Sequence, residues 1–370
     1  MPNVVPAATQ ATTPRQRTIV RSGWWRMAAL PFVAPGWGVG RERSRRPWTL
    51  QKSGRPSDAP VTVPTVGAEE LEERPDRLAG VALLAGVLLA ILYVVVHTAW
   101  GQRLDVAALD GRTTRPLVLL ATGRLLDTIS VASLTLLGAA ARVIAGARGR
   151  IHLAITAAVV VLGANVSTQL LKRVVLSRLE LVASDPLPTP SFPSGHTTVA
   201  ASLALAFVLV VPARLRGMTA VCGVAYACLI GTGVVTAGWH RPSDVISVYL
   251  AVAVWTGLAT AGLMRWRGLA RDRDPDAVRE PRISPRLARI GAVLLALGFL
   301  GFLVVYVAIR QDRLDAVRLD GAFVAAQIVI VGTGLLVMAA LLAALRGVVL
   351  DPPLALVSPA SLRGTTRPMR

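Results

Sequence analysis

The chain has 370 residues, of which 53% are hydrophobic, 5% aromatic and 16% charged, and its mean hydropathy is +0.56. So much apolar content with so little charge excludes an ordinary soluble domain and indicates a multispanning membrane protein. The formal net charge of +19 comes almost wholly from arginine. Because much of this charge flanks apolar runs, we attribute it to membrane topology and anionic lipid, and we predict no nucleic-acid partner.

The two ends of the chain lack the pattern of folded segments. Residues 1–76 are rich in Arg, Pro, Gly and Ser without sustained hydrophobic periodicity, which predicts a disordered basic arm. No long apolar core follows its early arginines, so we do not expect a signal peptide. Residues 347–370 are predicted to form a disordered tail.

From Leu78 onward, apolar runs of about 20 residues recur, which is the length that crosses a hydrocarbon core of roughly 30 Å. They predict an all-α, polytopic transmembrane helical bundle of about eight spans. We divide it into a membrane core over 77–264, a basic loop over 265–289 and a C-terminal transmembrane hairpin over 290–346. The predicted spans are 78–99, 117–145, 151–171, 197–213, 217–237, 244–264, 288–309 and 321–345.

A short loop signature occurs twice, each time after an apolar span. The two copies read Arg103-Leu104-Asp105 with Leu109-Asp110-Gly111, and Arg313-Leu314-Asp315 with Leu319-Asp320-Gly321. This predicts a duplicated helical hairpin. The first copy carries Arg124 and Asp127 where the second has Leu335 and Met338, and such a pair either snorkels to the interface or supports a nearby site.

A first polar segment, Pro193-Ser194-Gly195-His196, opens the span 197–213. Proline and glycine break regular structure, and a serine suits the N-cap of the helix that follows. Free N–H groups and the positive end of the helix dipole then form an anion site, which His196 would face from the first turn. The alternative is an ordinary interfacial histidine.

A second polar segment surrounds His240 at the start of the span 244–264. Pro242 suits the first helical turn, and Asp244 can reach back to one ring nitrogen of His240. Such a carboxylate fixes the tautomer and raises the basicity of a nucleophilic imidazole. The alternative is an aspartate favoured by the helix dipole beside an unrelated histidine.

Lys172, Arg173 and Arg178 follow the third span, on the same side as both polar segments. They are either snorkelling anchors or the binding groups for an anion such as phosphate. Most other basic residues fall in alternate loops, which predicts that those loops and both termini are cytoplasmic. Both polar segments would then face the outside of the cell membrane. The residues that carry this topology are Arg148, Arg150, Arg214, Arg216 and the arginines from 265 to 289.

These segments resemble the type 2 phosphatidic acid phosphatase superfamily of integral-membrane lipid phosphatases, whose sequence blocks are K-x6-R-P, P-S-G-H and S-R-x5-H-x3-D. The second block matches in full, and His240 with Asp244 matches half of the third. The Ser and Arg of the third block fall on Gly233 and Val234. In the first block Lys172 matches, but its arginine lies one position early, at Arg178, and no proline follows. The resemblance covers roughly 117–264 and implies a six-span phosphatase-like core.

For the reacting groups, the resemblance implies that His240 is the nucleophile and forms a phosphohistidine, with Asp244 orienting it. His196 would protonate the leaving alcohol and later activate water. No metal or other cofactor is implied.

For the phosphate, the resemblance implies contacts from Lys172, Arg178 and the amides around Ser194 and Gly195. We predict that Arg241, or else Arg173, supplies the guanidinium that is missing at Val234.

The predicted function is metal-independent hydrolysis or transfer of a lipid phosphate or diphosphate at the outer membrane face. A second hypothesis is a non-catalytic relative that binds lipid phosphate or scaffolds envelope enzymes, which the missing arginine favours. A solute transporter is a third, but it predicts polar residues or broken helices at mid-membrane, and the spans contain few.

Overall fold

The computed structural model describes residues 68–112, 115–129, 150–175, 191–267, 283–311 and 316–346, with isolated positions between 135 and 187. The chain divides into two units, Met1–Val63 and Pro64–Arg370. Every element described belongs to the second unit and is helical, with no strand in these ranges. The predicted all-α polytopic bundle is therefore confirmed. The predicted tail and residues 1–67 of the predicted arm lie outside the described residues.

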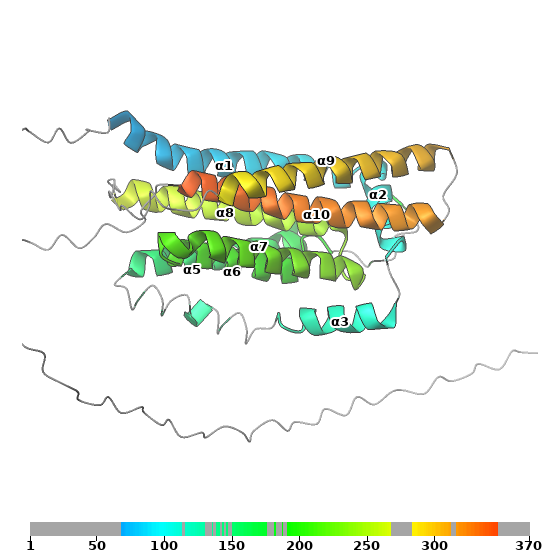
Figure 1. Ribbon diagram of the computed structural model, residues 1–370, viewed down its shortest axis with the longest axis horizontal. Helices are drawn as coiled ribbons and strands as arrows, with labels where there is room; N and C mark the ends of the chain where they lie inside the picture. Colours follow the sequence, from blue (N-terminus) through cyan, green and yellow to red (C-terminus); the bar gives the residue numbers. More distant parts are fainter. Residues whose placement is uncertain are drawn as a thin grey trace, which may run out of the picture. The chain divides into compact units, whose positions relative to one another are not determined.

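The long helices run alongside one another (Figure 1). Their bounds are α1 (Ala68–Val96), α2 (Ala99–Asp110), α3 (Pro116–Leu126), α5 (Ile151–Leu170), the π-helical turn η1 (Leu171–Val175), α6 (Gly195–Val210), α7 (Ala213–Thr236), α8 (Pro242–Arg267), α9 (Ile283–Arg310) and α10 (Ala316–Leu345). Within the described ranges, six helices are long and apolar enough to cross a membrane. The spans predicted at 117–145 and 197–213 overlap the shorter apolar helices α3, which ends at Leu126, and α6, so a total of eight stays a prediction.

Three predictions of local structure differ from the structure. The loop predicted over 265–289 is shorter, because α8 continues to Arg267 and α9 begins at Ile283. Residues 68–76 were assigned to the arm, but they form the first turns of α1. The first copy of the loop signature is not a loop, because it lies within the helix α2 and its C-cap, Gly111. The Thr98 side chain caps this helix by accepting a hydrogen bond from the Gly101 N–H at 3.1 Å. The helix buries Asp105, Val106 and Leu109, so packing stabilises it where the sequence signals were weak.

The C-terminal hairpin packs against the core through the two copies of the repeat. Helix α10 contacts α2, α7 and α8 as well as its partner α9. A Cβ atom at Gly111 would lie 1.8 Å from the carbonyl oxygen of Leu319, so only glycine permits this approach. Ala107 packs beside it with Val305 and Ala322. The duplicated segments therefore contact each other.

Burial separates an inner from an outer group of helices. In α8, 67% of the most apolar 18-residue stretch is buried inside the protein, whereas the corresponding share is 17% for both α1 and α9. Leu83 of α1 and Phe299 of α9 are 70% and 61% exposed, which in a membrane protein indicates contact with lipid.

The bundle has two ends, which we name by their contents. The α2 end holds α2 and the first turns of α6, α8 and α10, together with the last turns of α1 and α5. The opposite end holds the start of α1 and α9 and the end of α8 and α10. There Arg265 of α8 forms an ion pair with Asp76 of α1, and Arg216 donates to the carbonyl of Leu345.

Candidate active site

The first polar segment forms the turn that starts α6. Ser194 has an extended backbone and is the N-cap, and its Oγ accepts hydrogen bonds from the N–H and the hydroxyl of Thr197. The N–H of Ser194 itself donates to the carbonyl of Asp244 at 3.1 Å. No backbone acceptor is described for the N–H groups of Gly195 and His196. These two amides, rather than that of Ser194, are the donors available to an anion at this helix N-terminus.

The second polar segment pairs a histidine with a buried carboxylate. His240 Nδ1–H donates to Asp244 Oδ2 at 3.2 Å, and Asp244 lies in the first turn of α8, fully buried. The same oxygen accepts the N–H of Arg241 at 3.0 Å. Because a carboxylate only accepts, the proton lies on Nδ1 and the lone pair is on Nε2. Nε2 is therefore the ring nitrogen available for attack.

The two segments meet at the α2 end. In addition to the bond between Ser194 and Asp244, the His196 ring lies 5.4 Å from the ring of Trp239, centre to centre. Burial, followed by the nearby charges of His240 and Lys172, lowers the pKa of His196. Two imidazoles and one ammonium group therefore share one region, and the neutral form of His196 is favoured while no anion is bound.

The basic groups of the first block are described only in part. Lys172 lies in η1 and is half-buried, and Arg173 beside it is exposed. Arg178 lies outside the described residues, so its predicted phosphate contact stays a prediction.

Val234, which stands where the third block has an arginine, has a structural role. Val234 is fully buried in α7, and its carbonyl accepts the N–H groups of Trp239 at 2.9 Å and His240 at 3.3 Å. The guanidinium of Arg241 is also buried, and it donates to Ser191 Oγ and to the carbonyl of Leu187 at 3.1 Å. Arg241 therefore holds the loop in front of Ser194, and a direct phosphate contact from it stays a prediction.

One buried carboxylate at this end was not recognised as a site residue from the sequence. Asp105 of α2 accepts the Ser243 hydroxyl at 2.6 Å and the Ser243 N–H at 3.2 Å. Asp105 thereby caps the N-terminus of α8, although it belongs to another helix. Ser243, the residue that it binds, directly precedes Asp244. The only sequence signal for Asp105 is its place in the first copy of the duplicated signature, and hydrophobic periodicity does not indicate a function for it.

Arg112 was also missed. It follows α2, its Nη1 donates to the carbonyl of Leu109 at 2.7 Å, and its side chain covers Gly238. Gly238 has a φ of 71°, and a Cβ there would lie 2.8 Å from Arg112 Nε. The loop thus needs glycine both for its backbone conformation and for the space that Arg112 fills. The guanidinium of Arg112 consequently lies against Gly238, which is two positions before His240 in the sequence.

Other predicted groups lie elsewhere. Arg124 and Asp127 of the first repeat copy are exposed around the end of α3. Across the described part of the chain, no three His, Cys, Asp or Glu side chains gather in a way that could hold a metal ion.

The family model for the PAP2 superfamily matches residues 82–267. The chain belongs to this superfamily. The match begins inside α1, ahead of the region near 117 where the motif resemblance starts, so the first span is part of the shared core. Neither the curated proteins nor the solved structures contain a match. Membership of the PAP2 superfamily suggests a membrane phosphatase that acts on lipid phosphates.

Proposed function

We propose that this chain is a phosphatase or phosphotransferase that acts on a lipid phosphate or lipid diphosphate through a phosphohistidine at His240. The observation that carries the proposal is the hydrogen bond from His240 Nδ1 to the buried Asp244, made beside the α6 N-terminus. A site that only binds phosphate needs positive charge. It does not need an oriented imidazole with a free Nε2.

In the first step, His240 Nε2 attacks phosphorus and the bond from phosphorus to the leaving oxygen breaks. Protonated His196 gives its proton to that oxygen, so the lipid product departs as an alcohol or a monophosphate. In the second step, His196 takes a proton from water, whose oxygen attacks the phosphohistidine and releases inorganic phosphate. Asp244 supports the positive charge that develops on the His240 ring.

The phosphate oxygens would be held by backbone amides and cations. The free N–H groups of Gly195 and His196 and the ammonium of Lys172 are suited to this role. Arg178, which the family pattern implies, and Arg241, which directly follows His240 in the sequence, are further candidates. We add Arg112, because it brings a guanidinium to Gly238, on the loop that carries His240. In this proposal Arg112 replaces the arginine that the third block lacks at Val234.

The substrate class follows from the location of the groups. They lie at one end of a bundle whose outer helices expose apolar side chains, so a headgroup can reach them while its tails stay in the bilayer. From the arginine distribution we infer that this end lies at the outer face of the cell membrane.

The deciding experiment is phosphate release from a panel of lipid phosphates and diphosphates, with and without chelator, for the wild type and His240→Ala. We expect release by the wild type that is insensitive to chelator and absent in the variant. Trapping of labelled phosphate on His240 would support the intermediate directly.

The competing hypothesis is a non-catalytic member that binds lipid phosphate, and the buried Val234 favours it. It predicts that the wild type retains lipid phosphate without releasing phosphate from any substrate in the panel. That result would remove the enzymatic proposal.

A further inference from the structure

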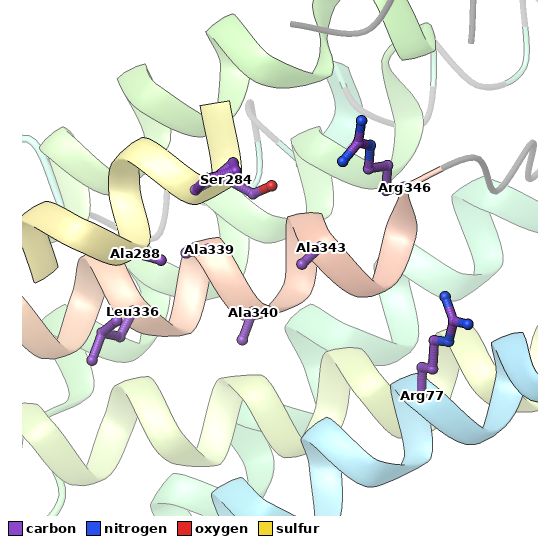
Figure 2. Close-up of a pocket in the computed structure, with 9 residues that line it drawn as sticks. Arg77, Ser284, Ala288, Leu336, Ala339, Ala340, Ala343 and Arg346 are labelled. Atoms are coloured by element: carbon purple, nitrogen blue, oxygen red, sulfur yellow. The ribbon is translucent and has the colours of Figure 1, made fainter. Parts of the chain in front are cut away.

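A second polar feature lies at the opposite end of the bundle, far from the two histidines. An open pocket of about 510 Å³ lies there between α1, α9 and α10 (Figure 2). This volume is within the range of about 300–1,000 Å³ that ligand pockets occupy. Its lining includes Arg77, Leu336, Ala339, Ala340, Ala343 and Arg346.

The lining is divided into an apolar part and a basic part. Leu336, Ala339, Ala340 and Ala343 come from one helix, α10, and the small side chains of the three alanines leave room beside it. Figure 2 shows the guanidinium groups of Arg77 and Arg346 beyond Ala343, away from Leu336. The pocket is therefore apolar along its length and positively charged at one end.

The surroundings of the pocket indicate contact with lipid. Helices α1 and α9, which form its sides, expose apolar residues such as Leu83 at 70% and Val293 at 57%. Arg77 lies at the beginning of the spanning segment Pro75–Val96, and Arg346 directly follows the segment Leu319–Leu345. Both guanidinium groups are thus at the depth of lipid headgroups, while the alanines lie at the depth of acyl chains.

We propose that this pocket binds an anionic phospholipid, with its phosphate between Arg77 and Arg346 and an acyl chain along Ala339, Ala340 and Ala343. Arginine binds phosphate through two parallel N–H donors, and basic pockets between transmembrane helices are suited to anionic headgroups. The arginine distribution of the sequence predicts that this end faces the cytoplasm, and the cytoplasmic leaflet is the one that carries anionic lipid. The proposal does not depend on catalysis at His240.

The test is lipid retention by the full chain in detergent, measured by native mass spectrometry with phosphatidylglycerol and phosphatidylcholine offered in equal amounts. We expect preferential retention of phosphatidylglycerol by the wild type. Arg77→Gln and Arg346→Gln should each weaken retention roughly fivefold, the effect of about one cationic contact at a membrane surface. Ala340→Phe fills the pocket without changing charge and should weaken retention as well.

Arg289→Gln is the matched control, because Arg289 is an exposed arginine of α9 near the same end and does not line the pocket. Its retention should equal that of the wild type. The proposal is overturned if phosphatidylcholine is retained equally, if Arg289→Gln weakens retention as much as Arg77→Gln, or if well-folded Ala340→Phe retains lipid fully. Phosphate release, measured in parallel, reports on the catalytic proposal separately.

Discussion

The two ends of the bundle differ in how deeply their paired charged groups are buried, although Arg216 at the opposite end is buried as well. At the α2 end, Asp105, Asp244 and Arg241 are 6%, 0% and 0% exposed, and each has fixed protein partners. At the opposite end, the Arg265–Asp76 pair joins side chains that are 55% and 64% exposed. Exposed pairs contribute little to stability, whereas breaking a buried pair is costly.

This difference shows which end is organised before a ligand arrives. Buried, hydrogen-bonded groups keep one geometry, and that geometry is what lowers a reaction barrier. Exposed arginine side chains beside an apolar pocket can change conformation to contact a lipid headgroup, which suits a binding site that is not catalytic. Substitutions of the same type at each end therefore test the comparison.

The largest difference should come from one aspartate at each end. Asp244→Asn lets the amide favour the wrong tautomer of His240, so we expect kcat for phosphate release to fall about 10³-fold or more. Asp76→Asn removes only an exposed ion-pair partner and should leave kcat within about twofold. Equal kcat values for these two variants would show that the buried pair does not orient the nucleophile.

Arg112 should show the next largest effect. Arg112→Gln removes the guanidinium beside Gly238, and we expect kcat/KM to fall roughly 10- to 100-fold, the loss of one charged contact to phosphate. Arg112→Lys keeps the charge without the planar fork and should recover part of the loss. If Arg112→Gln matches the wild type with every lipid substrate, another group must replace the arginine missing at Val234.

Asp105 should affect both stability and rate, as expected of a positioning residue. Asp105→Ala leaves the buried N–H and hydroxyl of Ser243 without their acceptor, so the free energy of unfolding should fall by about 1–3 kcal/mol. We expect kcat to fall roughly tenfold with little change in KM.

Rescue separates positioning from simple loss of folding. Asp105→Asn keeps one acceptor oxygen and should recover most of kcat, and a double-mutant cycle with Ser243→Ala should show coupling. Additive effects of Asp105→Ala and Ser243→Ala on kcat would contradict a role for this contact.

The smallest effect should be a shift in a pH profile. Burial and the charges of His240 and Lys172 lower the pKa of His196, so its protonated, proton-donating form is lost at a lower pH than for an exposed histidine. Lys172→Met removes one of these charges and should raise the pKa of His196. The fall of kcat/KM at alkaline pH that is due to deprotonation of His196 should then occur at higher pH.

Lys172→Arg is the control for this shift, because it keeps the charge and should keep the limb where the wild type has it. The position of the limb is informative even if Lys172→Met lowers the absolute rate. A limb that stays in place in Lys172→Met would mean that Lys172 and His196 do not share a site.

The sequence by itself predicted the features that depend on local chemistry and periodicity. Apolar runs long enough to span a bilayer predicted the helical bundle, and the pattern Pro193–His196 predicted an N-cap at Ser194. Helix α6 starts at Gly195, two residues before the predicted span 197–213. The four-residue spacing of His240 and Asp244 predicted their hydrogen bond, because α8 starts between them. The duplicated signature predicted that two segments are related.

Only the tertiary structure decided which distant residues meet. Asp105 lies 138 positions from Ser243, and Arg112 lies far from Gly238 in the chain, so no local pattern links them. The pocket between Arg77 and Arg346 likewise depends on how α1 and α9 pack around α10. The physical reason is that periodicity determines which face of a helix is apolar, whereas the contacts of its polar residues depend on which helices pack beside it.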